Sequence, residues 1–191
     1  GDYTVALGDI NGGNAQAAVI ASAYAFGGDL NNLDPAFEFW TQMAEDGRIN
    51  TLDILQQNFE TGEIPVGVIW SFTAIPYKDQ ITKYKLQANI PTDGSIMSGY
   101  ASVINKYAPH PCAAALAREY IFSDEGQANL AAAGAIPTRT DVEIPDDIQN
   151  ATFKSEDYAN AIPMEDTDAY TKACETVVER WQEEITPLLV Q

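Results

Sequence analysis

The chain has 191 residues, of which 46% are hydrophobic and 20% are charged, which is enough apolar material for a buried core and argues against disorder. Ten basic residues against 28 acidic residues give a formal net charge of −18, which disfavours nucleic acids and anionic membrane surfaces as partners because both are polyanions. No apolar run approaches the roughly 18 residues of a membrane-spanning helix.

The chain begins with a strand, a glycine-rich turn and a helix. The alternating run Tyr3–Leu7 predicts the strand, Gly8–Asn14 forms the turn, and an alanine-rich pattern up to Phe26 predicts the helix, with Asn14 as its N-cap. This order places free backbone N–H groups at the end of a strand, where a ligand can reach them.

The later segments alternate between helix and strand patterns. In chain order, the spacing of apolar residues predicts helices at 34–46 and 51–61, a strand at 65–70, a helix at 72–83, strands at 84–90 and 98–105, helices at 112–122, 124–133 and from 146, and a last helix from 166. Asp34, Thr51, Ser71 and Ser123 are expected to cap four of these helices. The alternation predicts an α/β chain with a largely parallel sheet or sheets.

The last helix has the clearest apolar stripe. Its members recur at spacings of three and four, with charged residues on the opposite face: Tyr170, Cys174, Val177, Trp181, Ile185 and Leu188. Cys112 and Cys174 are the only cysteines, and the sequence leaves open whether they form a disulfide.

Four segments, in matching order, resemble the extracellular solute-binding proteins of bacterial ABC importers. The most specific is residues 113–139, where AAALAREYIFSDEGQ is followed by GAIPTR. The preceding residues 98–111 are similar to the strand and turn before this helix in the family, while residues 66–70 and 3–14 resemble two of its strands with the turn that follows. The resemblance is greatest to the class that includes iron, thiamine, polyamine and phosphonate binders.

The resemblance implies a type II periplasmic-binding-protein-like fold, in which two α/β lobes hold the ligand between them. Residues 1–85 and about 140–191 would then form lobe 2, and residues 86–139 would belong to lobe 1, whose N-terminal part is absent. We therefore expect a C-terminal fragment with most of one lobe and part of the other, whose exposed sheet edges and apolar surface favour self-association. The resemblance also implies a periplasmic or extracellular location, as a lipoprotein or secreted protein, and an ABC permease as partner.

The first candidate ligand-binding group lies in the glycine-rich turn. It comprises Asp9, Asn11, Gly12, Gly13 and Asn14, because helix N-termini stabilise anionic or polar groups and the Asp9 carboxylate could bind a ligand amine. The alternative is a purely structural capped turn whose glycines permit positive φ.

The second candidate group follows the predicted strand at 65–70. Trp70, Ser71 and Phe72 begin the next helix, and Tyr100 is a weaker candidate. Iron-binding relatives have a tyrosine pair at about this position, and its absence here counts against iron. An aromatic side chain would instead stack on an organic ligand or face a cation. The alternative is that Trp70 and Phe72 are core residues.

The sequence therefore predicts a binding protein that captures a small polar solute for ABC-transporter uptake, without catalysis, cofactor or metal. An amine, a phosphonate or a zwitterion such as an aminophosphonate would suit an acidic chain with a glycine-rich helix start. The runner-up is a small α/β enzyme that uses carboxylates at Gly8–Asn14. A third possibility is that the fragment binds no solute, because half of the cleft is missing.

Overall fold

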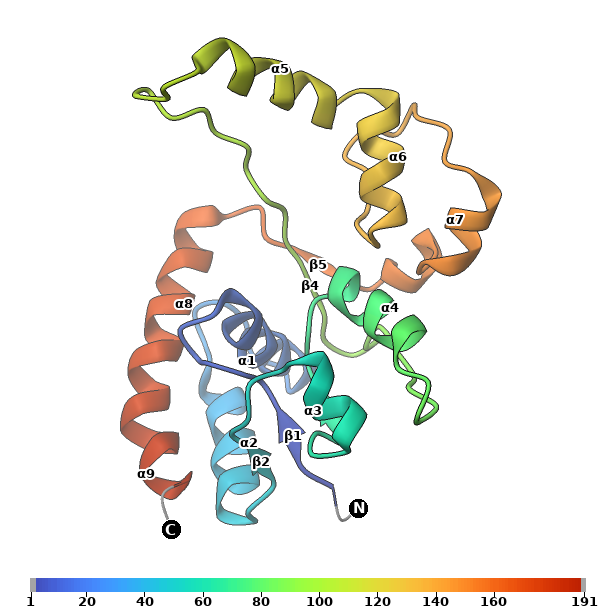
Figure 1. The fold of residues 1–191 in the computed structure, drawn as a ribbon. Coiled ribbons are helices and arrows are strands. Elements are labelled where there is room, and N and C mark those ends of the chain that lie inside the picture. Colours follow the sequence, from blue (N-terminus) through green and yellow to red (C-terminus); the bar gives the residue numbers. More distant parts are fainter. Residues whose placement is uncertain (1–2, 190–191) are drawn as a thin grey trace.

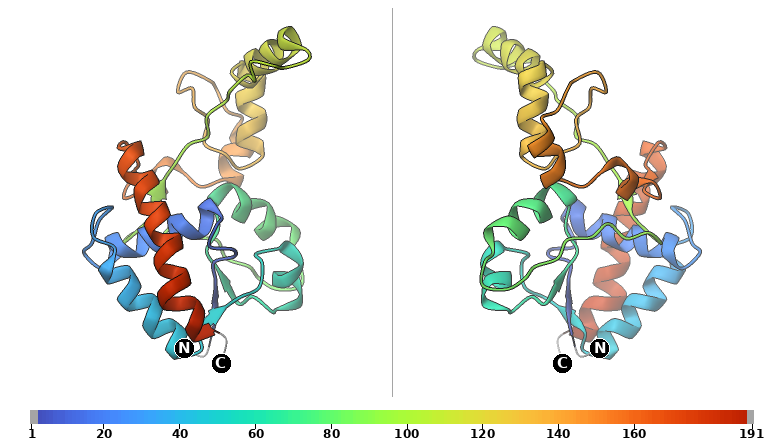
Figure 2. Two further views of the ribbon diagram at one scale, coloured as in Figure 1. Left: turned by 90° about the vertical axis from the view of Figure 1, so that its left-hand side faces the viewer. Right: turned by 90° about the vertical axis from the view of Figure 1, so that its right-hand side faces the viewer.

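The computed structural model describes residues 3–189, which form a body and an arm. The arm, residues 98–151, rises from the body and carries helices α5–α7 (Figure 1, Figure 2). The elements are β1 (Val5–Ala6), α1 (Gly13–Ala25), α2 (Asp34–Glu45), β2 (Ile49–Asn50), α3 (Gln56–Thr61), β3 (Val66–Gly67), α4 (Ser71–Gln80), β4 (Ile96–Met97), α5 (Pro111–Ile121), α6 (Asp124–Ala132), α7 (Asp146–Ala151), the 3-10 turn η1 (Ser155–Tyr158), β5 (Ile162–Pro163), α8 (Thr167–Arg180), the π-helical turn η2 (Trp181–Ile185) and α9 (Thr186–Leu189).

The body is built on a small parallel sheet with strand order β2-β1-β3. Val5 of the central strand pairs with Ile49 on one side and Val66 on the other. Successive residues of a strand face opposite sides of the sheet. Ala6 accordingly packs in a cluster with residues of α3 and of the C-terminal end of α4. Leu7 packs in the main core with α1, α2 and α8. The chain is therefore α/β with a parallel sheet, as the alternating pattern predicts.

The main core joins α1, α2 and the last helix. The predicted stripe is confirmed: Val177, Trp181 and Ile185 are buried, and its other members pack against them. The Trp40 ring lies 5.8 Å from that of Trp181, and its indole N–H donates to Ser22 Oγ at 2.9 Å. The π-helical turn η2 ends two residues before Pro187, which has no N–H to continue the α-helical bonding.

The strand predictions are partly wrong. Residues 84–90 and 98–105 form no strand, and β2, β4 and β5, which the sequence pattern did not predict, are present. The apolar run 65–70 yields β3, but β3 lies at an edge of the described sheet and Val66 is 38% exposed. A strand needs a partner as well as a pattern, so residues 98–105 stay irregular where the described chain offers none.

The helix starts also differ from the predictions. Gly12, rather than Asn14, precedes α1 as its N-cap, and Trp70, rather than Ser71, precedes α4. The third helix begins at Gln56, five residues after the expected cap Thr51. By contrast, Ser123 caps α6 as predicted, because its Oγ accepts a hydrogen bond from Gly126 N at 3.1 Å.

The arm is thinly packed except around α6. Gln127 is fully buried there: its Nε2 donates to Ile121 O, and its Oε1 accepts from the backbone N–H groups of Thr138 and Arg139. In α5, by contrast, no residue is buried. The arm meets the body near β4 and β5, which pair in parallel, and near α4 (Figure 1).

Candidate functional site

Two helices of the body begin next to each other because their preceding strands are neighbours. The carboxyl end of β1 leads to the turn before α1, and that of β3 leads to the turn before α4. Val68 N donates to Ala6 O at 3.0 Å, so the pairing continues beyond β3 up to the two turns. The first N–H groups of both helices therefore lie at one edge of the sheet, where parallel α/β folds bind ligands.

Asn14 holds these two strand ends together. Its half-buried amide Nδ2 donates to Leu7 O at 3.2 Å and to Val68 O at 2.6 Å. Both amide hydrogens are thus used to fix the loops, one from each strand. Asn14, which the sequence predicted to cap α1, instead fixes the spacing between the starts of α1 and α4.

Asp9 and Asn11 shape the turn and leave a charge at its surface. Asp9 Oδ1 accepts from both Asn11 N and Asn11 Nδ2, each at 2.9 Å. These bonds, the backbone one first, hold the pKa of Asp9 below its ordinary value, so the exposed carboxylate is ionised at neutral pH. A ligand ammonium group could approach it from solvent.

The glycines of the turn have separate roles. Positive φ occurs at Gly8 (77°), whereas Gly12 has φ −81°, so left-handed backbone does not explain Gly12. A Cβ at Gly12 would lie 3.1 Å from Asp9 O, while a Cβ at Gly13 would meet no atom within 4 Å. Gly13 therefore faces open space at the first residue of α1, whose N-cap provides no side-chain hydrogen bond.

Trp70, Ser71 and Phe72 lie at the start of α4, below the arm. All three are half-buried, and neither aromatic belongs to the two buried clusters found among the described residues. The Phe72 ring makes an edge contact with Tyr100, at 6.0 Å between ring centroids, although Tyr100 is 82% exposed. Phe72 also contacts Gly134, because a Cβ there would lie 3.1 Å from Phe72 O.

Tyr158, a residue that the sequence did not predict as part of the site, also lies in this region. Tyr158 is half-buried beside Ser71, and its ring lies 6.1 Å from that of Phe153. Burial raises the pKa of the Tyr158 phenol, and the neighbouring Ser71 side chain opposes the rise. Tyr158 ends a short 3-10 turn in an acidic, irregular stretch, so no periodic signal could have marked it.

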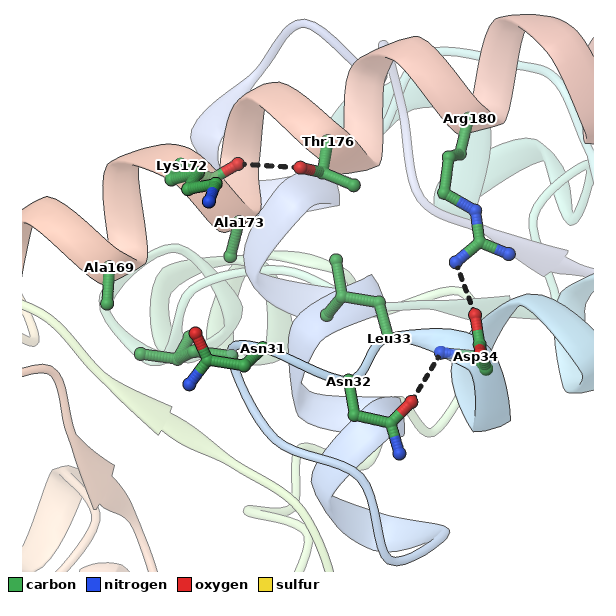
Figure 3. A pocket seen from close by; sticks show the side chains of 10 residues that line it. Asn31, Asn32, Leu33, Asp34, Ala169, Lys172, Ala173, Thr176 and Arg180 are labelled. Carbon is green, nitrogen blue, oxygen red and sulfur yellow. Dashed lines mark hydrogen bonds and ion pairs between the residues drawn. The ribbon is translucent and has the colours of Figure 1, made fainter.

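Other polar features of the body lie elsewhere. A cavity of about 170 Å³ separates the loop Leu30–Asp34 from α8, and there Arg180 donates to Asp34 at 2.8 Å (Figure 3). It contains none of the predicted site residues.

Among residues 3–189, no three His, Cys, Asp or Glu side chains gather as a metal-ligand group, and no helix is long and apolar enough to cross a membrane. Both cysteines are free thiols.

Two contacts link parts of the predicted set: Asn14 bonds the strand end that leads to α4, and Phe72 of α4 contacts Tyr100 on the arm. Comparison with known families finds that the model described as bacterial extracellular solute-binding protein matches residues 3–162. No curated protein matches the chain.

Proposed function

Because the chain belongs to the bacterial extracellular solute-binding proteins, we propose that it captures a small polar solute between the body and the arm and passes it to a membrane permease. Proteins of this family act in the periplasm or outside the cell, in solute uptake by ABC transporters, and they are normally non-catalytic. The position of the cleft, the ligand class and the residues that contact the ligand are our own proposals for this chain.

We assign the body to lobe 2 and the arm, up to Arg139, to lobe 1 of a two-lobed binding protein. Among the described residues, the body contains 3–97 and 152–189, and the arm joins it near β4 and β5 (Figure 1). Helix α7 lies with α6 in the arm, so the arm continues to about residue 151. A solute held between these parts would contact the start of α4 on the body side and Tyr100 on the arm side.

The observation that carries the proposal is the pair of adjacent helix N-termini. Neither the α1 N-cap nor the α4 N-cap contributes a side-chain hydrogen bond, and Thr73 N of α4 donates to Trp70 O at 3.0 Å, so the N–H groups at the start of α1 and those of Ser71 and Phe72 in α4 are the ones offered to a ligand. Together they favour an anionic group. The ionised Asp9 carboxylate beside them favours an ammonium group. We therefore propose a zwitterion with an ammonium and an oxyanion group, such as an aminophosphonate, as the ligand class.

Calorimetric titration with three ligands of equal carbon chain tests this proposal: an aminoalkylphosphonate, the alkylphosphonate and the alkylamine. The aminoalkylphosphonate should bind most tightly. Asp9→Asn should weaken its binding by about tenfold or more, which corresponds to about 1.4 kcal/mol, and should leave the alkylphosphonate unchanged or slightly tighter. Glu38→Gln, an equal charge change at an exposed position of α2, should have no effect.

A second variant separates loss of the site from loss of the fold. Gly13→Leu places a side chain in the open space before α1 and improves helix propensity, so the melting temperature should be kept while the affinity for all three ligands falls. If none of the ligands binds the parent protein, the proposed ligand class is wrong. Turnover of any ligand would favour the runner-up, an enzyme that uses the turn Gly8–Asn14, whose only carboxylate is Asp9.

A further inference from the structure

The turn between β1 and α1 contains the one Asn-Gly pair of the sequence, Asn11-Gly12. Asparagine is a chemically labile residue, because the amide nitrogen of the next residue can attack its side-chain carbonyl carbon. Glycine leaves that nitrogen least hindered, since it has no Cβ. Both residues are exposed, so water reaches them. The pair therefore has the composition and the access that deamidation requires.

The folded turn holds both reacting groups in hydrogen bonds to Asp9. Gly12 N, the attacking atom, donates to Asp9 O at 2.9 Å, and Asn11 Nδ2, the leaving group, donates to Asp9 Oδ1 at 2.9 Å. The same Oδ1 accepts from Asn11 N at 2.9 Å. The ionised Asp9 carboxylate also disfavours the negative charge that Gly12 N acquires when it loses its proton. All of these interactions oppose the reaction as long as the turn stays closed.

We propose that Asn11 is a deamidation site and that Asp9 controls its rate. Gly12 N loses its proton and bonds to Asn11 Cγ, the Cγ–Nδ2 bond breaks, and Nδ2 leaves as ammonia, so that a five-membered succinimide forms. Water then opens the ring. Attack of water at Cγ gives aspartate, whereas attack at the main-chain carbonyl carbon gives isoaspartate, in which the main chain runs through the side-chain carbons. One water is consumed and one ammonia is released, with no oxidant or reductant.

A second loop of the body provides an internal reference. Asp29 Oδ1 accepts from Asn31 N at 2.7 Å and from Asn32 N at 2.9 Å, so this exposed loop is held by a carboxylate in a similar way. Asn31 and Asn32 are followed by Asn32 and Leu33, however, and not by glycine. Their side chains meet the same solvent, but the attacking nitrogen is hindered, so these two asparagines should react much more slowly than Asn11.

Deamidation changes the charge and the length of the turn. The new carboxylate at position 11 replaces the Nδ2 donor that helps to lower the pKa of Asp9 and adds a like charge beside it, so the pKa of Asp9 should rise. Isoaspartate adds one carbon atom to the main chain between β1 and α1. The effect of these changes on solute binding rests on the proposed function, whereas the modification itself does not.

Peptide mass spectrometry on the 191-residue chain tests the proposal without any ligand, so a protein that binds no solute would still give an answer. The chain is incubated at one mildly alkaline pH, either folded or unfolded in guanidinium chloride. In the unfolded chain, Asn11 should be the first asparagine to convert, to both aspartate and isoaspartate. In the folded chain, the same conversion should be at least about tenfold slower, because the turn must open first.

Three variants assign the protection to Asp9. Asp9→Ala removes the side-chain acceptor and should speed the conversion of Asn11 in the folded chain by about fivefold or more. Asp9→Asn keeps an acceptor oxygen without the charge, so its rate should lie between those of the parent and of Asp9→Ala. Asp29→Ala, the matched control, removes the equivalent bonds of the other loop and should leave the rate at Asn11 unchanged. Circular dichroism checks that each variant keeps its helix content.

Conversion of Asn31 or Asn32 before Asn11 in the unfolded chain would overturn the proposal, as would equal rates at Asn11 in the folded and unfolded chains. Equal rates in Asp9→Ala and Asp29→Ala would show that Asp9 does not protect the turn. If Asp9→Ala loses its helix signal, Asp9→Asn decides instead, and a rate no faster than that of the parent then contradicts the role of Asp9.

Discussion

Asn14 shows how one side chain can fix the geometry of a candidate site without touching a ligand. Its amide bonds Leu7 O and Val68 O, which follow two neighbouring strands. The sequence marks Asn14 as a cap because asparagine is favoured at helix starts. It could not show the second carbonyl, since Val68 lies 54 residues away and becomes a neighbour only when β1 and β3 pair.

The first prediction at this scale concerns the Asn14 amide. Asn14→Ala leaves two loop carbonyls without their donor, so the free energy of unfolding should fall by about 1–3 kcal/mol. Urea denaturation followed by circular dichroism measures the change. Asn31→Ala removes an exposed amide in the α1–α2 loop and should cost less than about 0.5 kcal/mol. Equal losses in the two variants would show that the Asn14 bonds do not stabilise the body.

At the scale of elements, the segment that most resembles known binding proteins is explained by packing within the arm. Ser123 caps α6, Gly126 is needed because a Cβ would overlap the Tyr120 carbonyl oxygen, and Gln127 bonds three backbone groups. Arg139 forms ion pairs with Asp124 at 2.8 Å and Asp141 at 2.7 Å. The specific residues of this segment therefore serve the fold of the arm rather than the ligand.

Gln127 provides the prediction for this element. Gln127→Met keeps the length of the side chain but leaves Ile121 O and the N–H groups of Thr138 and Arg139 without partners. The free energy of local unfolding of the arm should therefore fall by about 2–4 kcal/mol. Hydrogen exchange at residues 124–139 should become faster, while exchange in α2 should not change.

The exposed Asn129 offers the control for that experiment. Asn129→Ala removes a single hydrogen bond to the Tyr120 hydroxyl and should leave exchange in α6 within about threefold of the parent, since exposed bonds contribute little. Uniformly faster exchange in both the arm and the body of Gln127→Met would instead mean that the two parts unfold together.

Helices were predictable from the sequence and strands largely were not. The stripe on α8 and the apolar face of α2 repeat over several turns, so their buried residues follow from spacing. The strands are two residues long, too short for an alternating pattern, and β2 forms because Ile49 pairs with Val5 of β1. The two turns of the site were predicted, but their meeting and the presence of Tyr158 depend on non-local pairing.

Considered as a whole, the molecule carries far more negative charge than its ion pairs neutralise. The net charge is −18, and the ion pairs found, such as Arg139–Asp124 and Arg180–Glu184, involve partly exposed side chains. Exposed pairs contribute little, so repulsion between carboxylates should dominate the electrostatic part of stability.

Salt should therefore stabilise this protein. Between about 10 and 300 mM NaCl at neutral pH, screening should raise the melting temperature by about 2–4 °C, which corresponds to about 1 kcal/mol for a chain of this size. Differential scanning calorimetry measures the shift. At about pH 5, nearer to the isoelectric point of about 4.1, the shift should shrink because fewer carboxylates are ionised. A lower melting temperature at high salt would mean that the ion pairs dominate.

The arm joins the body through β4 and β5 and contacts it at Phe72 of α4, so a rotation about this junction would move the far end of the arm the most. Each strand contributes two residues to the junction, whereas α5 alone has 11 residues and is about 16 Å long. A turn of about 10° at the junction would move the far end of such a helix by about 3 Å, close to the length of a hydrogen bond. Small torsions near the body are thus amplified at the tip of the arm, where a contact could be made or broken by a rotation too slight to disturb the sheet.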